Sequence, residues 1–214
     1  MPLRNRGAKA RLRAVRPGEV AVLDNYVSRS QCDRILEELE FAYWTPSEIT
    51  WRARSGLVKT RLSMGRRSEG TTEEWFSSEL RRELRRIETR ICTGLDLEAR
   101  YLEYWQATRY RRGGHFDAHL DTGVFAEEPA GDRVVTLLLY LNTPARGGST
   151  YFPELGLDVE AQAGRLAAWM NILPDGTLDS RMKHAARPVV KGSKITLTTW
   201  SRQRPARPIA SEGN

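Results

Sequence analysis

The second half of the chain consists of short apolar runs separated by glycine, proline and aspartate, and this texture limits the fold more than any other feature. The runs cover residues 101–110, 134–142, 150–152, 165–172 and 194–200. Their lengths suit strands, and the residues between them favour turns. Because helical patterns come first and many short strands follow, we expect an α+β chain whose second half is a β-sandwich or jelly roll.

The first half predicts one strand and two helices. Residues 20–23 form a short apolar run, and Ser28 or Ser30 can cap a helix that continues to about Tyr43. We expect the N-terminal helices to pack against one sheet of the jelly roll.

The second helix has the clearer pattern. Thr71 and Glu74 form a capping box, Gly94 can end the helix, and apolar residues recur at spacings of three and four, at Phe76, Leu80, Leu84, Ile87 and Ile91. Arginines on the same segment are mixed with glutamates, so we interpret them as a solvated face and expect no nucleic-acid partner. Residues 51–70, before this helix, are predicted to form an Arg-rich loop.

The predicted organisation has four parts: a basic flexible tail (1–18), an N-terminal helical and loop segment (19–97), the jelly-roll core (98–202) and a flexible C-terminal tail (203–214). The net charge of +7 comes largely from basic residues in the first part. A solvated arm accounts for that charge without a partner. No apolar run reaches the roughly 18 residues of a membrane span, and no signal peptide is visible, so we expect a soluble cytoplasmic protein.

The histidines suggest a metal site. His115 and Asp117 form one His-x-Asp tripeptide, and His119 and Asp121 form a second. Residues two apart on a strand point to the same face, so either pair can present two ligands to one metal. His184 is the distant histidine that can supply the third ligand. Two histidines and one carboxylate are the facial triad of non-haem iron(II) oxygenases, which leaves coordination positions open for a cosubstrate and dioxygen.

A lysine strengthens this interpretation. Lys194 lies inside an otherwise uncharged run that ends at Trp200. A buried ammonium requires an anion, and the C5 carboxylate of 2-oxoglutarate would supply one. A lysine that faces solvent from an edge strand is the alternative.

Several motifs together resemble the prolyl 4-hydroxylase-like family of Fe(II)/2-oxoglutarate-dependent dioxygenases. The first is the run from Tyr110 through Gly113 to His119-Leu-Asp121. Further motifs that resemble the family follow in order, at 133–136, 139–142, 147–152, 174–179, 184, 188–189 and 192–200. The resemblance covers roughly residues 98–200 and implies that the core is a double-stranded β-helix, that is, a cupin-like jelly roll.

The resemblance implies the roles of single residues. His119, Asp121 and His184 would hold Fe(II), because Tyr110 and Gly113 match the family only in that register. Lys194, Thr150 and Tyr110 would bind 2-oxoglutarate, with Tyr140 behind them. The residues expected to face the substrate are Glu103, Phe116, Arg133 and Trp200.

The resemblance also implies a reaction: hydroxylation of an aliphatic C–H bond by O2, with release of succinate and CO2 and with ascorbate as an expected reductant. A prolyl residue in a peptide or protein is the first substrate hypothesis. Gly114 and Phe116 depart from the family pattern, since a tyrosine commonly stands at the position of Phe116.

Alternative functions stay open from the sequence. The runner-up is hydroxylation of a free amino acid or a small natural-product intermediate, whose carboxylate the Arg-rich residues 51–67 would clamp. A nucleic-acid demethylase shares the metal chemistry, although that family usually binds 2-oxoglutarate through an arginine. A non-enzymatic cupin-like protein with zinc at His115, His119 and His184 is the remaining class. The oligomeric state is expected to be a monomer or a homodimer.

Overall fold

The computed structural model describes residues 15–53 and 55–208. Its N-terminal part contains β1 (Val20–Leu23), α2 (Arg29–Leu39), β2 (Thr45–Pro46), β3 (Ile49–Arg52), β4 (Val58–Arg61), β5 (Arg66–Arg67), β6 (Glu69–Thr72), the 3-10 helix η1 (Glu73–Trp75) and α3 (Ser78–Leu95). The part that follows contains η2 (Ala99–Tyr101), β7 (Gln106–Tyr110), β8 (His115–His119), β9 (Arg133–Tyr140), β10 (Arg146–Gly147), β11 (Thr150–Phe152), η3 (Pro153–Leu155), β12 (Leu157–Val159), β13 (Leu166–Met170), η4 (Ser180–Met182), β14 (His184–Ala186), β15 (Val189–Lys191) and β16 (Lys194–Arg202). The described chain is therefore mostly sheet with two α-helices.

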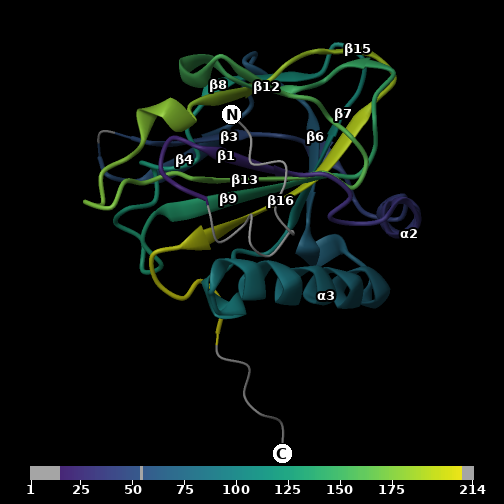
Figure 1. Ribbon diagram of the computed structural model, residues 1–214. Coiled ribbons are helices and arrows are strands. Elements are labelled where there is room, and N and C mark those ends of the chain that lie inside the picture. Colours follow the sequence, from purple (N-terminus) through teal and green to yellow (C-terminus); the bar gives the residue numbers. More distant parts are fainter. Residues whose placement is uncertain (1–14, 54, 209–214) are drawn as a thin grey trace, which may run out of the picture.

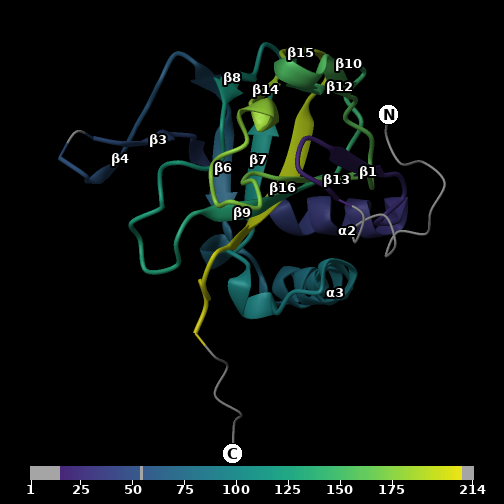
Figure 2. The same cartoon turned by 60° about the vertical axis from the view of Figure 1, so that its left-hand side comes forward.

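Two sheets form the body of the molecule. The larger sheet has the strand order β1-β13-β9-β16-β7-β6-β2, and the smaller has the order β12-β11-β14-β8-β5. Figure 2 shows the smaller sheet above the larger one. Neighbouring strands come from distant parts of the chain, as where β1 pairs with β13 and β8 with β14. This arrangement fits the predicted jelly roll.

The side chains of β9 point alternately to the two faces of the larger sheet, and each face packs in a different hydrophobic cluster. Leu137 and Leu139 belong to a cluster with apolar residues of both α-helices, whereas Tyr140 packs with Phe152 and Trp169 between the sheets. Successive strand residues point to opposite faces, so the same strand supports the helices on one side and the interior of the jelly roll on the other. Figure 1 accordingly shows α2 and α3 on the side of the larger sheet away from the smaller one.

The start of α3 differs from the sequence prediction. Thr71 does not cap a helix, because residues 69–72 form β6 and Thr71 pairs with Ala107 of β7. The helix begins only at Ser78, where the Ser77 hydroxyl accepts a hydrogen bond from the amide of Leu80 at 3.0 Å. Cross-strand hydrogen bonds therefore override the local capping-box signal.

The first helix is shorter than predicted. It ends at Leu39 instead of Tyr43, and Ser28 caps it together with Gln31 in a capping box. The predicted Arg-rich loop also differs, since residues 49–52 pair with residues 58–61 as a β3–β4 hairpin. This hairpin projects from the body in Figure 2.

Parts of both predicted tails pack on the body. Val15 is buried with the helix-side core. Near the other end, the Ala206 amide donates to the Arg100 carbonyl, and the Arg207 guanidinium binds the buried Glu88 carboxylate at 2.8 and 3.1 Å. The remaining tail residues, 1–14 and 209–214, lie outside the described residues. Within the described part, no helix is long and apolar enough to cross a membrane.

Candidate iron and cosubstrate site

Three potential metal ligands converge between the sheets. His119 ends β8, His184 begins β14, and the pairing of these strands places the two histidines opposite each other. Asp121 follows two residues after His119, and its carboxylate oxygens lie 3.8 Å from His119 Nε2 and 3.7 Å from His184 Nε2. All three ligand atoms lie within 4.8 Å of one another, the spacing that one cation can bridge.

Hydrogen bonds orient the two imidazoles for metal binding. His119 Nδ1 lies 2.8 Å from the Asp117 carbonyl, and His184 Nδ1 lies 2.9 Å from the Met182 carbonyl. Because a carbonyl only accepts, each Nδ1 carries the proton and each Nε2 presents its lone pair. Burial and the neighbouring His184 lower the pKa of His119, which favours the neutral imidazole that a metal requires.

Two consecutive hydrogen bonds hold the Asp121 carboxylate in place. The Thr136 hydroxyl donates to Asp121 Oδ2 at 2.7 Å, and Asn171 Nδ2 donates to that same hydroxyl oxygen at 2.8 Å. Burial alone would raise the pKa of Asp121, but the two histidines, Arg133 and this hydrogen bond lower it below its usual value. The donor set therefore fits a divalent metal: two imidazoles that present Nε2 and one ionised carboxylate.

The duplicated tripeptide is resolved in space. His115 and Asp117 are not part of the converging group, and the Asp117 side chain is 73% exposed. His115 instead lies with Nδ1 3.1 Å from the Gly113 carbonyl. The structure thus brings together the second pair, His119 and Asp121, with His184.

Thr136 and Asn171 were not predicted as site residues, and a variant measures their contribution. Thr136→Val removes the hydrogen bond to Asp121 while keeping the shape of the side chain. We expect iron(II) affinity to fall about 10- to 100-fold, since groups that orient ligands typically contribute that much. Titration of the apoprotein with Fe(II) under argon measures it. Thr108→Val, at another buried threonine in the wall of the same cavity, should leave the affinity unchanged.

Lys194 provides the charge complement for a cosubstrate. It pairs with Tyr110 across β16 and β7, is only 1% exposed, and its Nζ lies 4.3 Å from the centre of the Tyr110 ring. Among the described residues it has no hydrogen-bond or ion-pair partner. A buried ammonium without an anion fits a ligand that brings a carboxylate.

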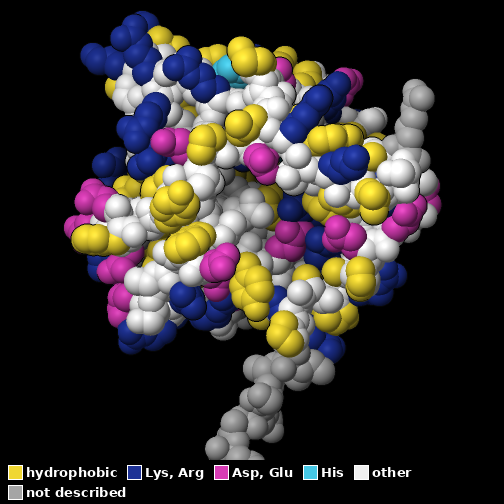
Figure 3. Space-filling model, turned by 180° about the vertical axis from the view of Figure 1, so that it is seen from behind, with side chains coloured by type: hydrophobic (Ala, Val, Ile, Leu, Met, Phe, Trp, Pro, Cys, Tyr) yellow, Lys and Arg dark blue, Asp and Glu magenta, His cyan; other side chains and the backbone are white. Residues whose placement is uncertain are grey.

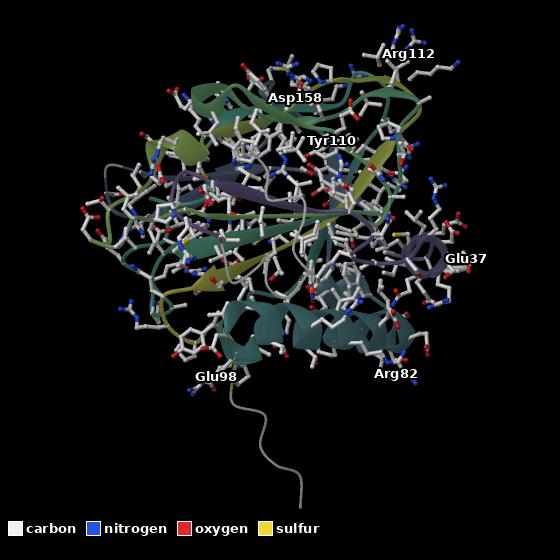
Figure 4. All side chains as sticks on the ribbon, viewed as in Figure 1. Glu37, Arg82, Glu98, Tyr110, Arg112 and Asp158 are labelled. Carbon is white, nitrogen blue, oxygen red and sulfur yellow. The ribbon has the colours of Figure 1, made fainter. Side chains whose placement is uncertain are left out.

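The hydroxyl groups beside Lys194 form a relay. Tyr140 Oη donates to Thr150 Oγ1 at 2.7 Å, so the Thr150 proton is free to donate to a ligand oxygen. Thr150 and Tyr110 line the cavity, whereas Tyr140 lies behind Thr150. In Figure 4, Tyr110 lies inside between the sheets, while the labelled charged residues lie at the periphery.

One cavity of about 450 Å³ contains these groups. It is lined from the larger sheet by residues that include Tyr110, Thr136 and Lys194, and from the smaller sheet by His119, Thr150 and His184. Its lining also includes Ile49 and Thr50 of β3 and residues 124–125. On the face shown in Figure 3, basic side chains gather at the upper left, and basic, acidic and apolar side chains are mixed over the rest.

Three of the four predicted substrate residues line this cavity: Phe116, Arg133 and Trp200. The Arg133 guanidinium stacks 3.5 Å from the centre of the Trp200 ring. Glu103 lies behind it and binds that guanidinium through both carboxylate oxygens, at 2.7 and 2.8 Å. Phe116 stacks on the His119 ring with the centroids 3.7 Å apart.

The burial of Lys194 predicts that the affinity for 2-oxoglutarate depends on pH. Burial lowers the pKa of Lys194 from 10.5 to about 7, so the free site loses its ammonium as the pH rises through 7. A carboxylate binds the protonated form. We therefore expect 2-oxoglutarate affinity to be constant below about pH 7 and to weaken by up to about tenfold per pH unit above it.

Calorimetric titration of 2-oxoglutarate with Mn(II) in place of iron, from about pH 6 to about pH 9, measures this dependence. Lys194→Arg keeps a permanent charge and should flatten the profile. A profile that is unchanged in Lys194→Arg would assign the titration to another group.

Comparisons with known proteins agree with the geometry. The model of the 2OG-Fe(II) oxygenase superfamily matches residues 105–202. The chain is 36% identical over 138 residues to prolyl 4-hydroxylase subunit alpha-1 of Gallus gallus, covering 61% of this chain and 26% of that one. The chain thus spans about a quarter of the length of this relative.

Solved structures share the fold. A viral collagen prolyl hydroxylase from Paramecium Bursaria Chlorella virus-1, in complex with 2-oxoglutarate, is similar with a TM-score of 0.63 and 21% identity, covering 86% of this chain and 95% of that one. A prolyl hydroxylase from Trichoplax adhaerens, in complex with a peptide fragment of the hypoxia inducible factor oxygen degradation domain, has a TM-score of 0.62 and 15% identity, covering 86% and 83%. The family resemblance found in the sequence is supported by these similarities, and the His119, Asp121 and His184 group fits the iron that the name of the superfamily gives.

Proposed function

We propose that this protein is a 2OG-Fe(II) oxygenase that hydroxylates an aliphatic C–H bond of a prolyl residue in a peptide or protein, because the model of that superfamily matches residues 105–202. The observation that carries the proposal is one cavity that holds the His119, Asp121 and His184 ligand group together with the unpaired ammonium of Lys194. When bound, iron(II) with 2-oxoglutarate and O2 supplies the oxidising power to hydroxylate an unactivated carbon, with release of succinate and CO2.

Different residues of this chain would bind the metal and the cosubstrate. His119, Asp121 and His184 would hold the metal on one face, which leaves positions for the cosubstrate and dioxygen. Lys194 would neutralise the far carboxylate of 2-oxoglutarate, and the hydroxyl groups of Thr150 and Tyr110 would complete its hydrogen bonds. The depth of Lys194, 1% exposed, excludes water from this end of the site.

The outer part of the cavity would receive the substrate. Phe116 and Trp200 give the cavity wall apolar aromatic surface that suits a ring such as proline, and Arg133 is fixed on Trp200 by Glu103. Phe116 carries no hydroxyl to orient the substrate. The names of the relatives, which are prolyl hydroxylases, support the choice of a prolyl substrate.

Product analysis tests the proposed function. The purified protein with Fe(II), 2-oxoglutarate and O2 is incubated with proline-containing peptides, and succinate and peptide mass are followed together. We expect a mass gain of one oxygen on proline that requires both iron and 2-oxoglutarate. Succinate release without oxygen insertion into any proline compound would reject the substrate, and the absence of succinate release would reject the enzyme class.

Three further features stay predictions: ascorbate as the reductant, a cytoplasmic location, and a monomer or homodimer in solution.

A further inference from the structure

A second cation faces the cavity beside the metal ligands. Arg66 on β5 pairs with Phe116 on β8, and its Cζ atom lies 4.5 Å from the centre of the Phe116 ring. That ring stacks on His119. Arg66 and Phe116 both line the cavity. One aromatic ring thus contacts both a metal ligand and the Arg66 guanidinium.

Neutral acceptors hold this guanidinium in place. Arg66 Nε donates to Ser68 Oγ at 3.1 Å, and Nη1 donates to the Glu48 carbonyl at 2.8 Å. Among the described residues no acceptor binds Nη2, and no carboxylate forms an ion pair with Arg66. Burial is the main cause that lowers the pKa of Arg66, although Tyr110 and Asp121 favour its charge.

The other charges at the site have partners. Arg133 is neutralised by Glu103, whose two carboxylate oxygens bind it. With metal and cosubstrate bound, the two carboxylates of 2-oxoglutarate and that of Asp121 would balance iron(II) and Lys194. The carboxylates of Glu48 and Asp117, which also border the cavity, belong to exposed residues and make no ion pair with Arg66. Arg66 is then the one described cation of the cavity wall left without a counter-charge.

We propose that Arg66 binds a carboxylate of the substrate and so selects substrates that carry one close to the hydroxylated carbon. A partly buried, pre-positioned guanidinium with a free Nη2 is suited to a carboxylate. This inference rests on the proposed function and narrows its substrate class. The carboxylate has two sources: the α-carboxylate of free or C-terminal proline, or the side chain of an acidic residue next to an internal proline.

Matched acid and amide ligands test the role of Arg66. L-proline is compared with L-prolinamide, and a blocked Asp-Pro peptide with its Asn-Pro counterpart, by calorimetric titration into protein loaded with Fe(II) and 2-oxoglutarate under argon. We expect at least one acid to bind about tenfold or more tighter than its amide, the usual effect of a charge-assisted hydrogen bond. Which pair shows the preference identifies the source of the carboxylate.

Two variants test whether Arg66 causes the preference for the acid over the amide. Arg66→Gln should abolish it while leaving 2-oxoglutarate binding intact, which also shows that the variant is folded, and Arg66→Lys should retain part of it. Arg67→Gln is the matched control, because Arg67 is exposed and is not among the residues that line the cavity. It should keep the full preference.

Other results would overturn the assignment. Equal binding of acid and amide in both pairs, no measurable binding of either acid, or a preference that survives in Arg66→Gln would each do so. Loss of 2-oxoglutarate affinity in Arg66→Gln would instead assign the residue to the cosubstrate. These titrations need no turnover, so they decide the role of Arg66 even if the oxidation assay rejects the proposed function.

Discussion

His119→Ala should abolish iron binding and turnover, while His115→Ala should retain both. The two histidines stand four residues apart in tripeptides of the same His-x-Asp pattern, but only His119 has its Nε2 within reach of Asp121 and His184. Removing a group that only orients a metal ligand typically lowers metal affinity by about 10- to 100-fold. Removing the ligand itself should therefore lower metal affinity by more than about 100-fold.

The pair of variants controls for the removal of an imidazole from the same strand. Iron content after loading under argon and succinate release are measured on both, with circular dichroism as the check of folding. Retained iron in His119→Ala together with lost iron in His115→Ala would move the site to the first tripeptide.

Lys194→Met should weaken 2-oxoglutarate binding and at the same time stabilise the unliganded protein. Truncating one partner of a buried ion pair costs about 2 to 5 kcal/mol, so the dissociation constant of 2-oxoglutarate should rise by about 30-fold or more. Without the cosubstrate, the ammonium is buried and unpaired, and burial has lowered its pKa to about 7. Replacing it by a neutral side chain of similar length removes that cost.

The stability gain has a predictable pH dependence. The lowered pKa means that the unfolded chain binds more protons than the folded chain between about pH 7 and 10.5, so wild-type stability rises with pH in that window. The advantage of Lys194→Met should therefore be largest below about pH 7 and shrink above it. Thermal unfolding with and without 2-oxoglutarate and Mn(II) measures both effects.

Lys191→Met serves as the control, because Lys191 is an exposed lysine on β15. It should change neither the melting temperature nor the cosubstrate affinity. Lower stability of Lys194→Met in the absence of ligand would show that Lys194 contributes to the fold itself.

The strands of the core were predictable because their apolar runs alternate with turn residues. The run 150–152 matches β11, and 194–200 lies within β16. Two-residue spacing predicted that a histidine and a carboxylate could share a metal, but the choice of His119 and Asp121 over His115 and Asp117 came from the family resemblance. His184 was predicted as the third ligand because it is the distant histidine available in a jelly roll, since strand pairing over 65 residues leaves no local signal.

Three parts of the chain differ from the sequence prediction, each for its own physical reason. Thr71 and Glu74 carry a genuine helix-start pattern, but pairing of β6 with β7 satisfies the same backbone groups in another way. The β3–β4 hairpin was missed because its residues are mostly polar and none is fully buried, so no apolar alternation marks them. Arg207 was assigned to a tail because its partner, Glu88, lies on α3, far away in sequence.

The missed site residues are polar groups in strands or loops. Thr136 donates a hydrogen bond to Asp121, and Asn171 donates one to Thr136. The spacing of these residues in the sequence does not predict either contact. Arg66 stands beside Arg67 in an Arg-rich segment, and only the pairing of β5 with β8 distinguishes the one that faces the cavity.

A crystal structure of the protein with Mn(II) and 2-oxoglutarate, with the metal located by anomalous scattering, tests the central claim most directly. We expect one metal ion bound by His119 Nε2, His184 Nε2 and an Asp121 oxygen, with a cosubstrate carboxylate in contact with Lys194 Nζ. A metal bound through His115 or Asp117, or a 2-oxoglutarate whose carboxylates both lie away from Lys194, would contradict this account.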